Sequence, residues 1–338
     1  MHRHDRGGRE LAELHFHLGQ AVDPHILWSI AHQQGIRLPS KDYWDFYDLV
    51  TLGKEGSVTW DDYHELFHWT ELIQSSPLAM EPSVYEVLTG AYRASNLTLL
   101  EPGFNPMFRN RGGERDLDQI ILAALHGMER ALAEFPQMRA GIILMLDRRL
   151  PLEKNEIIVK KAIKYKNRGV VGIDIAGPRG DGFRYDDYAA LYALARDAGL
   201  KTTVHTGEDG DAEEMAHVVS VLPLNRINHG FRAYTSPELL RTIREKDLTL
   251  CLCPTSNMKV GFIRDIEHLR EVVRTLWDAN VKFCFNTDNP SMLRTTLTQE
   301  LEIIRTNGIL SESEIDQTVA WAFEAAFTPT EPGKNLYL

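Results

Sequence analysis

Short apolar runs alternate along this chain with longer segments whose apolar positions recur at helical spacing. Segments of the second kind include 185–198, 237–245, 266–279 and 296–306. This alternation is typical of βα units that build a parallel sheet. The runs predicted as strands are 13–18, 97–101, 141–147, 170–176, 201–205, 226–228, 249–253 and 282–286. Eight strands with helices between them predict a (β/α)₈ TIM barrel.

The connection after the first predicted strand is too long for a single helix. Between residues 22 and 95 it is rich in aromatic residues, among them Trp28, Trp44 and Trp69. We predict a helical insertion at about 22–95, within a single domain 1–338, that lies over the mouth of the barrel. Most of its aromatic side chains should belong to the core, and a few should line a substrate pocket.

Composition and charge narrow the classes of function. The chain has 338 residues, of which 43% are hydrophobic and 25% charged, as in a globular enzyme. The net charge of −11 argues against a nucleic-acid backbone as partner, because phosphate binding needs a basic patch. A nucleoside or free base carries little charge and stays compatible.

No membrane partner is expected, since no apolar run is long enough to span a bilayer. The three cysteines are too few for a disulfide framework, and the polar N-terminus lacks the apolar stretch of a signal peptide. We therefore expect a cytoplasmic protein, and the sequence leaves its oligomeric state open.

Candidate metal ligands stand at the ends of predicted strands. His15 and His17 occupy positions i and i+2 of the first strand, so their side chains share one face. A bare H-x-H pair is weak evidence for a metal. Three further predicted strands end in histidine or carboxylate side chains that could bind a metal or transfer a proton. They lie in V-H-T-G-E (His205, Glu208), N-H-G (His229) and N-T-D-N-P (Asp288).

Each of these residues also has a purely structural interpretation. His205 could be a core histidine, His229 a loop residue and Asp288 a helix cap. Their joint occurrence at successive strand ends makes chance an unsatisfactory explanation, because the active sites of such barrels lie at the carboxyl ends of the strands. Three imidazoles, one carboxylate and a bound water suit a catalytic zinc with an open position.

Taken in order, H-F-H-L, V-H-T-G-E, R-I-N-H-G, C-P-T-S-N and N-T-D-N-P resemble the adenosine/AMP deaminase family of the metal-dependent amidohydrolase superfamily. The segment V-V-G-I-D-I-A-G at 170–177 is similar to the family's fourth strand. The resemblance runs from about residue 13 to residue 290. It implies one Zn²⁺ per chain, held by His15, His17, His205 and Asp288.

The resemblance also implies roles for the remaining site residues. Glu208 would protonate the purine ring nitrogen next to the reacting carbon, and His229 would orient and deprotonate the attacking water. Gly177 would offer a backbone contact to the purine, and Asn289 would bond the imidazole-ring nitrogen of the base.

The residue types at these positions suit hydrolytic deamination, which needs an activated water and a proton donor. A zinc lowers the pKa of its water from 15.7 to roughly 7. Glu208 must be protonated to act as an acid, and burial favours that state. The strand 170–177 contains no lysine that could bridge a second metal, so one metal is the simpler interpretation.

Three departures from the family pattern affect the substrate. Gly19 and Gln20 stand where the family has Asp-Gly, and that aspartate bonds a ribose hydroxyl in adenosine deaminases. Gln20 either replaces the contact through its carboxamide or is a loop residue, and the space beside Gly19 should admit a larger group. Asn289 replaces a second aspartate, and Gly103 stands where relatives often carry arginine.

The sequence therefore predicts a zinc-dependent hydrolytic deaminase of purine metabolism that acts on adenosine or a related 6-aminopurine, nucleoside or base, and releases ammonia. One alternative is a metal-dependent amidohydrolase for a different cyclic amidine or amide, which the intact Glu208 and His229 disfavour. A second is a binding or signalling protein that has lost catalysis, and the retention of every proposed ligand argues against it.

Overall fold

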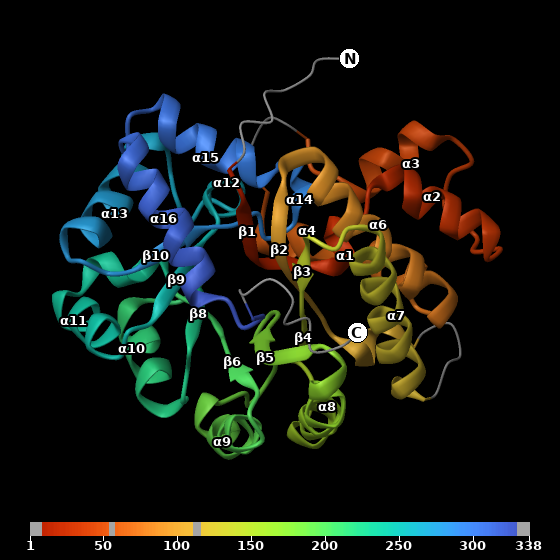
Figure 1. Ribbon diagram of the computed structural model, residues 1–338, viewed down its shortest axis with the longest axis horizontal. Helices are drawn as coiled ribbons and strands as arrows, with labels where there is room; N and C mark the ends of the chain where they lie inside the picture. Colours follow the sequence, from red (N-terminus) through yellow and green to blue (C-terminus); the bar gives the residue numbers. More distant parts are fainter. Residues whose placement is uncertain (1–8, 54–57, 111–115, 330–338) are drawn as a thin grey trace.

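The computed structural model describes residues 9–53, 58–110 and 116–329. Parallel strands lie at the centre of the molecule and helices surround them (Figure 1). The strands are β1 (Leu11–His17), β2 (Leu97–Phe104), β3 (Arg139–Ala140), β4 (Ile142–Asp147), β5 (Val170–Ala176), β6 (Lys201–Thr202), β7 (His205–Thr206), β8 (Arg226–His229), β9 (Thr249–Leu252) and β10 (Phe283–Phe285). They are buried along most of their length, as parallel strands covered by helices must be.

Hydrogen bonding orders these strands in two arcs. One arc has the order β1-β2-β4-β5-β6, with β3 beside β2, and the other has the order β10-β9-β8-β7. β3 and β4 form one extended run that is interrupted at Gly141. β6 and β7 likewise belong to one run, since the Thr203 amide donates to the Ile173 carbonyl at 3.0 Å and thereby continues the pairing of β5 with β6.

Backbone contacts join the two arcs into a closed barrel. Between β6 and β7, the Val204 carbonyl accepts a hydrogen bond from the Asn228 amide at 2.9 Å. This contact links the β6–β7 run, the fifth of the barrel, to β8. At the other seam Phe16 and Asp288 form a parallel bridge, and the His17 amide donates to the Asp288 carbonyl at 2.7 Å. With β3–β4 and β6–β7 each counted once, the described residues supply eight strand runs. The expected (β/α)₈ barrel is confirmed.

Helices follow the strands in the order expected for βα units. Around the barrel lie α7 (Leu117–Glu134), α8 (Leu152–Tyr165), α9 (Ala189–Asp197), α10 (Ala212–Val221), α11 (Pro237–Glu245), α12 (Pro254–Lys259), α13 (Ile266–Asp278), α14 (Pro290–Leu293), α15 (Leu297–Thr306) and α16 (Glu312–Ala325). Short 3₁₀ turns are η1 (Pro106–Arg109), η2 (Lys166–Arg168), η3 (Tyr185–Tyr188) and η4 (Phe231–Thr235). Many of the helices begin at a capping side chain, as α16 does in a capping box formed by Ser311 and Glu314.

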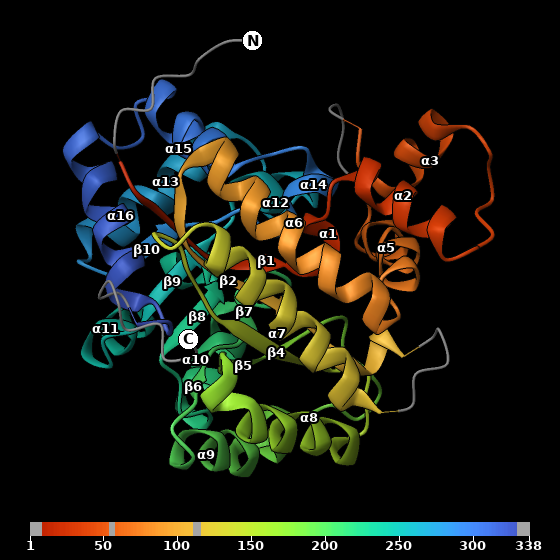
Figure 2. The same cartoon turned by 45° about the vertical axis from the view of Figure 1, so that its right-hand side comes forward.

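The insertion after the first strand is also present. It contains α1 (Leu18–Ala21), α2 (Pro24–Gln33), α3 (Tyr43–Val50), α4 (Trp60–Glu65), α5 (Phe67–Ile73) and α6 (Pro77–Ser95). α2 and α3 lie to one side of the barrel in both views (Figures 1 and 2). Phe46 belongs to the core as expected, but Trp44 is 68% exposed, so that aromatic residue packs into neither the core nor the pocket.

Several strands differ from their predicted bounds, and the second shows the largest shift of a single end. The second continues to Phe104 through Pro102 and Gly103, residue types that usually end a strand. Gly103 fits because it pairs with His17 on one side and with Ile143 on the other, and an added Cβ would lie only 2.9 Å from the Met145 sulfur. Among the described helices, none combines the length and the apolar character that crossing a membrane requires.

Candidate active site

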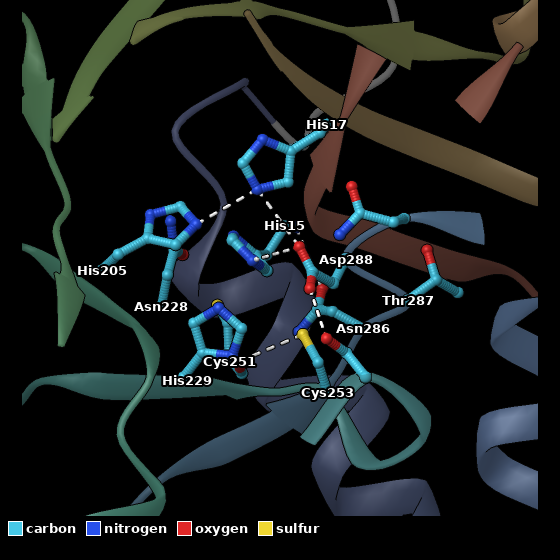
Figure 3. Close-up of polar contacts among 12 residues, drawn as sticks. His15, His17, His205, Asn228, His229, Cys251, Cys253, Asn286, Thr287 and Asp288 are labelled. Carbon is cyan, nitrogen blue, oxygen red and sulfur yellow. Dashed lines mark hydrogen bonds and ion pairs between the residues drawn. The ribbon is translucent and has the colours of Figure 1, made fainter. Parts of the chain in front are cut away.

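A cavity of about 280 Å³ opens at the carboxyl ends of the strands. His17, Phe104, Asp147 and Ala176, which end β1, β2, β4 and β5, all line it. Among the residues that the sequence nominated, the cavity is lined by His17, Gly19, Gln20, Gly177, His205, Glu208, His229, Asp288 and Asn289. His15 does not line the cavity but lies within the cluster of nitrogen and oxygen donors beside it (Figure 3).

Four buried side chains place possible metal-binding atoms within 4.8 Å of one another, namely His15, His205, His229 and Asp288. His17 joins this cluster, because its Nε2 lies 3.1 Å from Asp288 Oδ1 and 3.2 Å from His205 Nε2. The four ligands expected from the sequence therefore converge on one point, and His229 adjoins them.

The cluster has the spacing and chemistry of a metal site. Nitrogen ligands about 2.0–2.1 Å from a tetrahedral zinc lie roughly 3.3–3.4 Å apart. The measured separations are close to this value: 3.2 Å from His17 to His205, 3.1 Å from His17 to Asp288 and 3.5 Å from His15 to Asp288. The buried Nε2 of His15 faces Asp288 Oδ1 at 3.5 Å, a separation that suits two ligands of one ion better than a direct hydrogen bond.

The electrostatics favour the protonation states that metal binding requires. Burial lowers the pKa of His15 to about 4, so the ring is neutral near pH 7. Burial would raise the pKa of the Asp288 carboxyl, but hydrogen bonds from His15 and His17 outweigh that effect and hold it well below its usual range. The neutral His15 ring beside the ionised Asp288 carboxylate can bind a cation without releasing a proton.

Asp174, on β5, contacts the Nδ1 side of the His205 ring, opposite the Nε2 that faces His17. Its Oδ2 lies 2.9 Å from His205 Nδ1 and accepts a hydrogen bond from the Asn228 amide at 3.1 Å. A carboxylate at Nδ1 keeps the proton on that nitrogen and leaves Nε2 free to bind a metal. Burial alone would raise the pKa of Asp174, but its interaction with His205 lowers it, so Asp174 stays charged.

The second oxygen of Asp288 is held by residues from two other segments. Ser256, in α12, donates to Oδ2 at 2.5 Å, and Tyr63, in α4, donates to the same oxygen at 3.1 Å. Oδ1 is left to face His15 and His17. The inserted helices thus contribute a direct contact to a candidate metal ligand of the barrel.

Glu208 and His229 both line the cavity and form a pair. His229 Nε2 lies 3.1 Å from Glu208 Oε2, while Nδ1 lies 3.0 Å from the Asn257 amide nitrogen. Burial raises the pKa of the Glu208 carboxyl well above its usual range, and the charges of Asp209 and Asp288 add to this shift. Burial also lowers the pKa of His229 well below its usual range, with a further contribution from His15.

Two site residues have an uncommon backbone conformation. His229 has φ of 62° and Asp288 has φ of 64°, both in the left-handed region that L-residues rarely adopt. Such residues cost about 1–3 kcal/mol each and tend to occur where function requires them. Here the chain turns sharply at the end of a strand, and both side chains lie beside the cavity.

Gly177 and Asn289, the two residues predicted to contact the purine, both line the cavity. Gly177 has φ of 83°, and an added Cβ would lie 2.4 Å from Asp147 Oδ2, so only glycine fits. Arg148 donates to the Gly177 carbonyl at 3.0 Å and fixes this turn. Asn289 donates to the Tyr63 hydroxyl at 2.5 Å, and its amide oxygen is buried without a hydrogen-bond partner among the described residues.

The surroundings of Gly19 overturn one expectation from the sequence. The space beside Gly19 does not admit a larger substrate group, because the Arg109 guanidinium fills it. A Cβ added to Gly19 would lie 2.5 Å from Arg109 Nη2. Gln20 is buried, and its amide nitrogen donates to the Thr70 hydroxyl at 2.7 Å while the residue lines the cavity.

Sequence reasoning gave no role to several residues that support the site. Asp174, Ser256 and Asn257 lie inside motifs that carried the family resemblance, so the signal was present but its purpose was not evident. Tyr63 was one aromatic residue among many in the insertion. Arg109 had no signal at all, because nothing in P-M-F-R links it to Gly19, 90 residues earlier.

Comparison with known proteins agrees with this geometry. The sequence profile described as adenosine deaminase matches residues 11–337. An adenosine deaminase from Enterococcus faecalis is 30% identical over 324 residues, which cover 96% of this chain and 94% of that protein. The match therefore extends over the barrel and the insertion.

Two solved structures show the same fold. One is an amidohydrolase from Burkholderia ambifaria with bound zinc, with a TM-score of 0.81, 20% identity and coverage of 95% of this chain and 86% of the other. The other is Arabidopsis ADAL complexed with GMP, with a TM-score of 0.80, 22% identity and coverage of 97% and 95%. Because the profile spans the barrel and the insertion alike, the chain belongs to the adenosine deaminase family.

Proposed function

We propose that this chain is a metal-dependent hydrolase that removes the amino group of adenosine or a related 6-aminopurine and releases ammonia. The observation that carries the proposal is the contact of 3.1 Å between His229 Nε2 and Glu208 Oε2, directly beside the histidine–aspartate cluster. This arrangement places a candidate proton acceptor, a candidate proton donor and candidate metal ligands around one cavity.

We propose one Zn²⁺ per chain, bound by His15, His17, His205 and Asp288. Three imidazoles and one carboxylate are ligands that zinc prefers, and the similarly folded Burkholderia amidohydrolase contains zinc. When bound, the metal lowers the pKa of a water from 15.7 to roughly 7 and so supplies a nucleophile near neutral pH. The carboxylate of Asp174 would keep the Nε2 of His205 turned toward the ion.

Glu208 would act as the general acid. Hydrolysis of an aromatic amidine adds water across a ring C=N bond, so the ring nitrogen must gain a proton as the C–O bond forms. The raised pKa of Glu208 keeps its carboxyl protonated near neutral pH and able to donate. The neighbouring Asp209 and Asp288 add to that effect, because a second negative charge nearby is unfavourable.

His229 would orient the attacking water and accept its proton. Its lowered pKa keeps the ring neutral, and a neutral ring can accept a proton. The contact of the Asn257 amide with Nδ1 at 3.0 Å orients the ring so that Nε2 faces Glu208. Nε2 can accept a proton when the neutral ring carries its proton on Nδ1, which requires the Asn257 amide to present its oxygen to Nδ1; that oxygen is buried without another partner among the described residues. The proton taken from the water can then pass to the departing amino group, which leaves as ammonia, while the hydroxyl on the ring carbon becomes a carbonyl and its proton returns to the Glu208 carboxylate.

Gly177 and Asn289 would position the purine. The tight turn at Gly177 lets the backbone approach a flat base closely, and Asn289 offers an amide N–H to the imidazole-ring nitrogen. The family relative from Enterococcus faecalis is named an adenosine deaminase, and the Arabidopsis neighbour was crystallised with a purine nucleotide. Both names support a purine substrate.

Ammonia release from a panel of aminopurines tests the proposal. The zinc-loaded chain would be assayed with adenosine, deoxyadenosine, adenine, AMP and N6-substituted adenines, and metal content would be measured on the same preparation. We expect release from at least one compound and about one zinc per chain. If the zinc-loaded protein released ammonia from none of them while hydrolysing a cyclic amide or lactone, the proposal would be wrong.

A further inference from the structure

We propose that Arg148 is a positioning residue that fixes the candidate metal ligand His205 and the turn at Gly177 relative to each other. The inference rests on the proposed function, in which both of those residues have roles, while Arg148 itself stands outside the lining of the cavity. Its starting point is one pattern of contacts. Arg148 donates from Nη1 to the Gly177 carbonyl at 3.0 Å and from Nη2 to the His205 carbonyl. One guanidinium thus joins two parts of the site.

The Arg148 guanidinium lies where the pairing between β5 and the β6–β7 run stops. The Thr203 amide donates to the Ile173 carbonyl at 3.0 Å and extends the pairing of β5 with β6 by one step. In the described residues the ladder does not continue to β7, which pairs with β8 and forms an edge of its sheet. The carbonyls of Gly177 and His205 therefore accept from the Arg148 side chain, which bridges the two runs beyond the end of the ladder.

Arg148 also fixes the peptide groups on both sides of Gly177. Its own amide donates to the Ala176 carbonyl at 3.0 Å, and its Nη1 holds the Gly177 carbonyl. Because a trans peptide places its N–H opposite its C=O, the Gly177 N–H points away from the Arg148 amide. The direction of the backbone group that would contact the purine is therefore set by a single residue.

The charge of Arg148 is buried but compensated. The residue is 2% exposed, its Nη1 lies 3.9 Å from Asp209 Oδ2, and its Cζ lies over the Tyr185 ring, 5.7 Å from the centroid. The Tyr185 hydroxyl also donates to the His205 carbonyl, at 3.4 Å. Hydrogen bonds from a charged donor are roughly twice as strong as neutral ones, so Arg148 supplies the larger part of this hold. Asp209 directly follows Glu208, so the guanidinium also lies beside the loop of the proposed acid.

Arg270 makes the same pattern of contacts away from the cavity and supplies a matched control. It donates from Nη1 to the Gly308 carbonyl at 2.9 Å and from Nη2 to the Asn307 carbonyl at 2.7 Å, and it pairs with Glu267 at 3.1 Å. Of these four described residues, none lines the cavity. Arg270 is partly exposed and Arg148 is buried, so their effects on stability will differ in size, and the site readouts carry the comparison.

The experiment compares Arg148→Met, Arg148→Lys and Arg270→Met in the full chain. The first readout is the Kd of Zn²⁺, measured by competition with a chelating dye, which requires no turnover. The second is kcat and KM, measured with excess zinc for the best aminopurine of the panel. Methionine is unbranched and removes every donor, while lysine keeps the charge and loses the planar fork. Urea unfolding gives the stability of each variant.

A positioning role predicts defects that a purely structural role does not. Arg148→Met should weaken zinc binding by roughly 10- to 100-fold, the range found when a residue that supports a metal ligand is removed. With excess zinc it should still show a lower kcat and a higher KM, because the turn at Gly177 stays unsupported. Arg148→Lys should recover part of both defects. Arg270→Met should match the wild type in both readouts and differ only in its free energy of unfolding.

The outcomes separate the two proposals. If zinc binds but no aminopurine is deaminated, the proposed function fails, and the zinc titration still decides the role of Arg148. If Arg148→Met binds zinc and turns over substrate as well as Arg270→Met does, the inference is overturned while the proposed function stands. A wild-type chain that binds no zinc would overturn both.

A further variant decides the matter if neither Arg148 variant folds. Tyr185→Phe removes the second donor to the His205 carbonyl and leaves the buried charge in place. Zinc binding should then be weaker by about 2-fold, the lower end of the range for a neutral hydrogen bond. An unchanged Kd in Tyr185→Phe would show that the hold on this carbonyl does not position the ligand, and the inference would be overturned.

Discussion

The phenol oxygen of Tyr63 lies 3.1 Å from Oδ2 of Asp288, although the two residues are 225 positions apart in the sequence. The contact joins α4 of the insertion to the turn after β10 of the barrel. Burial raises the pKa of Tyr63 well above its usual range, so the phenol keeps its proton and acts as a donor. The insertion therefore helps to hold a candidate metal ligand in place as well as walling the pocket.

Tyr63→Phe should lower kcat moderately while zinc stays bound. The variant loses the contacts of the hydroxyl with Asp288 and with Asn289. A hydrogen bond is worth about 0.5–1.5 kcal/mol, so loss of the contact with Asp288 corresponds to a decrease of roughly 2- to 12-fold. Ser256 still donates to Oδ2 at 2.5 Å and should keep the carboxylate oriented. Steady-state kinetics and metal analysis test this. Tyr85→Phe is the control, because that hydroxyl donates to Glu134 at the surface. An unchanged kcat in Tyr63→Phe would contradict the positioning role.

Glu208→Gln should abolish turnover without emptying the metal site. The amide keeps the shape of the side chain but does not act as an acid, and loss of general acid catalysis costs at least ~10²-fold. Ammonia release and zinc content measured on the same sample test this. Glu65→Gln alters another carboxylate of the cavity and serves as the matched control. Loss of zinc from Glu208→Gln would show that Glu208 is a ligand and not an acid.

Removal of the metal should abolish activity and lower thermal stability together. Without a cation, the cluster brings a buried carboxylate and three imidazoles close together, and an ion that binds only the folded state stabilises it. At a free zinc concentration of 100 times Kd, this stabilisation is about 2.7 kcal/mol. Calorimetry before and after chelation, followed by zinc re-addition, measures both effects. Full activity in verified metal-free protein would refute a metal-dependent mechanism.

Glu300 should make the protein less stable as the pH rises. Burial raises its pKa from 4.5 to about 7, so between these values the folded state holds a proton that the unfolded state has lost. Stability therefore falls with increasing pH across that window. From pH 5.5 to pH 8 the loss from this residue is about 2 kcal/mol, at 1.36 kcal/mol per pKa unit.

Urea unfolding of the metal-loaded protein at pH 5.5 and pH 8 measures this effect. Glu300→Gln should reduce the difference between the two free energies of unfolding, because an amide does not titrate. It will not simply stabilise the protein, since the Thr255 amide and the Thr295 hydroxyl both donate to the carboxylate. Glu302→Gln, on the exposed face of the same helix, should leave the pH dependence unchanged.

Local patterns of the chain were sufficient to predict the barrel. Strand runs such as 141–147 and 170–176 are buried on both faces and read as continuous apolar sequence, and the structure contains them. The fifth run is broken between Thr202 and His205, which no periodicity indicated. Its pairing is instead completed by backbone contacts of Thr203 and Val204 with strands on either side, and these depend on barrel closure.

The candidate site could be predicted as far as its residues follow strand ends. His17, His205 and Asp288 converge because parallel strands end on the same side of the barrel. The contacts of Tyr63 with Asp288 and of Arg109 with Gly19 could not be predicted in this way. They arise where separate loops and turns meet above the strands, and no short-range pattern records which segments meet there.

The left-handed backbone at His229 sets the requirements of folding stability against those of catalysis at this position. Asparagine and glycine adopt φ near 60° at lower cost than histidine, so the local fold alone would favour them at this position. A library randomised at residue 229 and sorted only for folded protein should therefore accumulate those residues. Sorting the same library for ammonia release should return histidine. Any redesign of this protein guided by thermostability alone would thus tend to replace its proposed catalytic base.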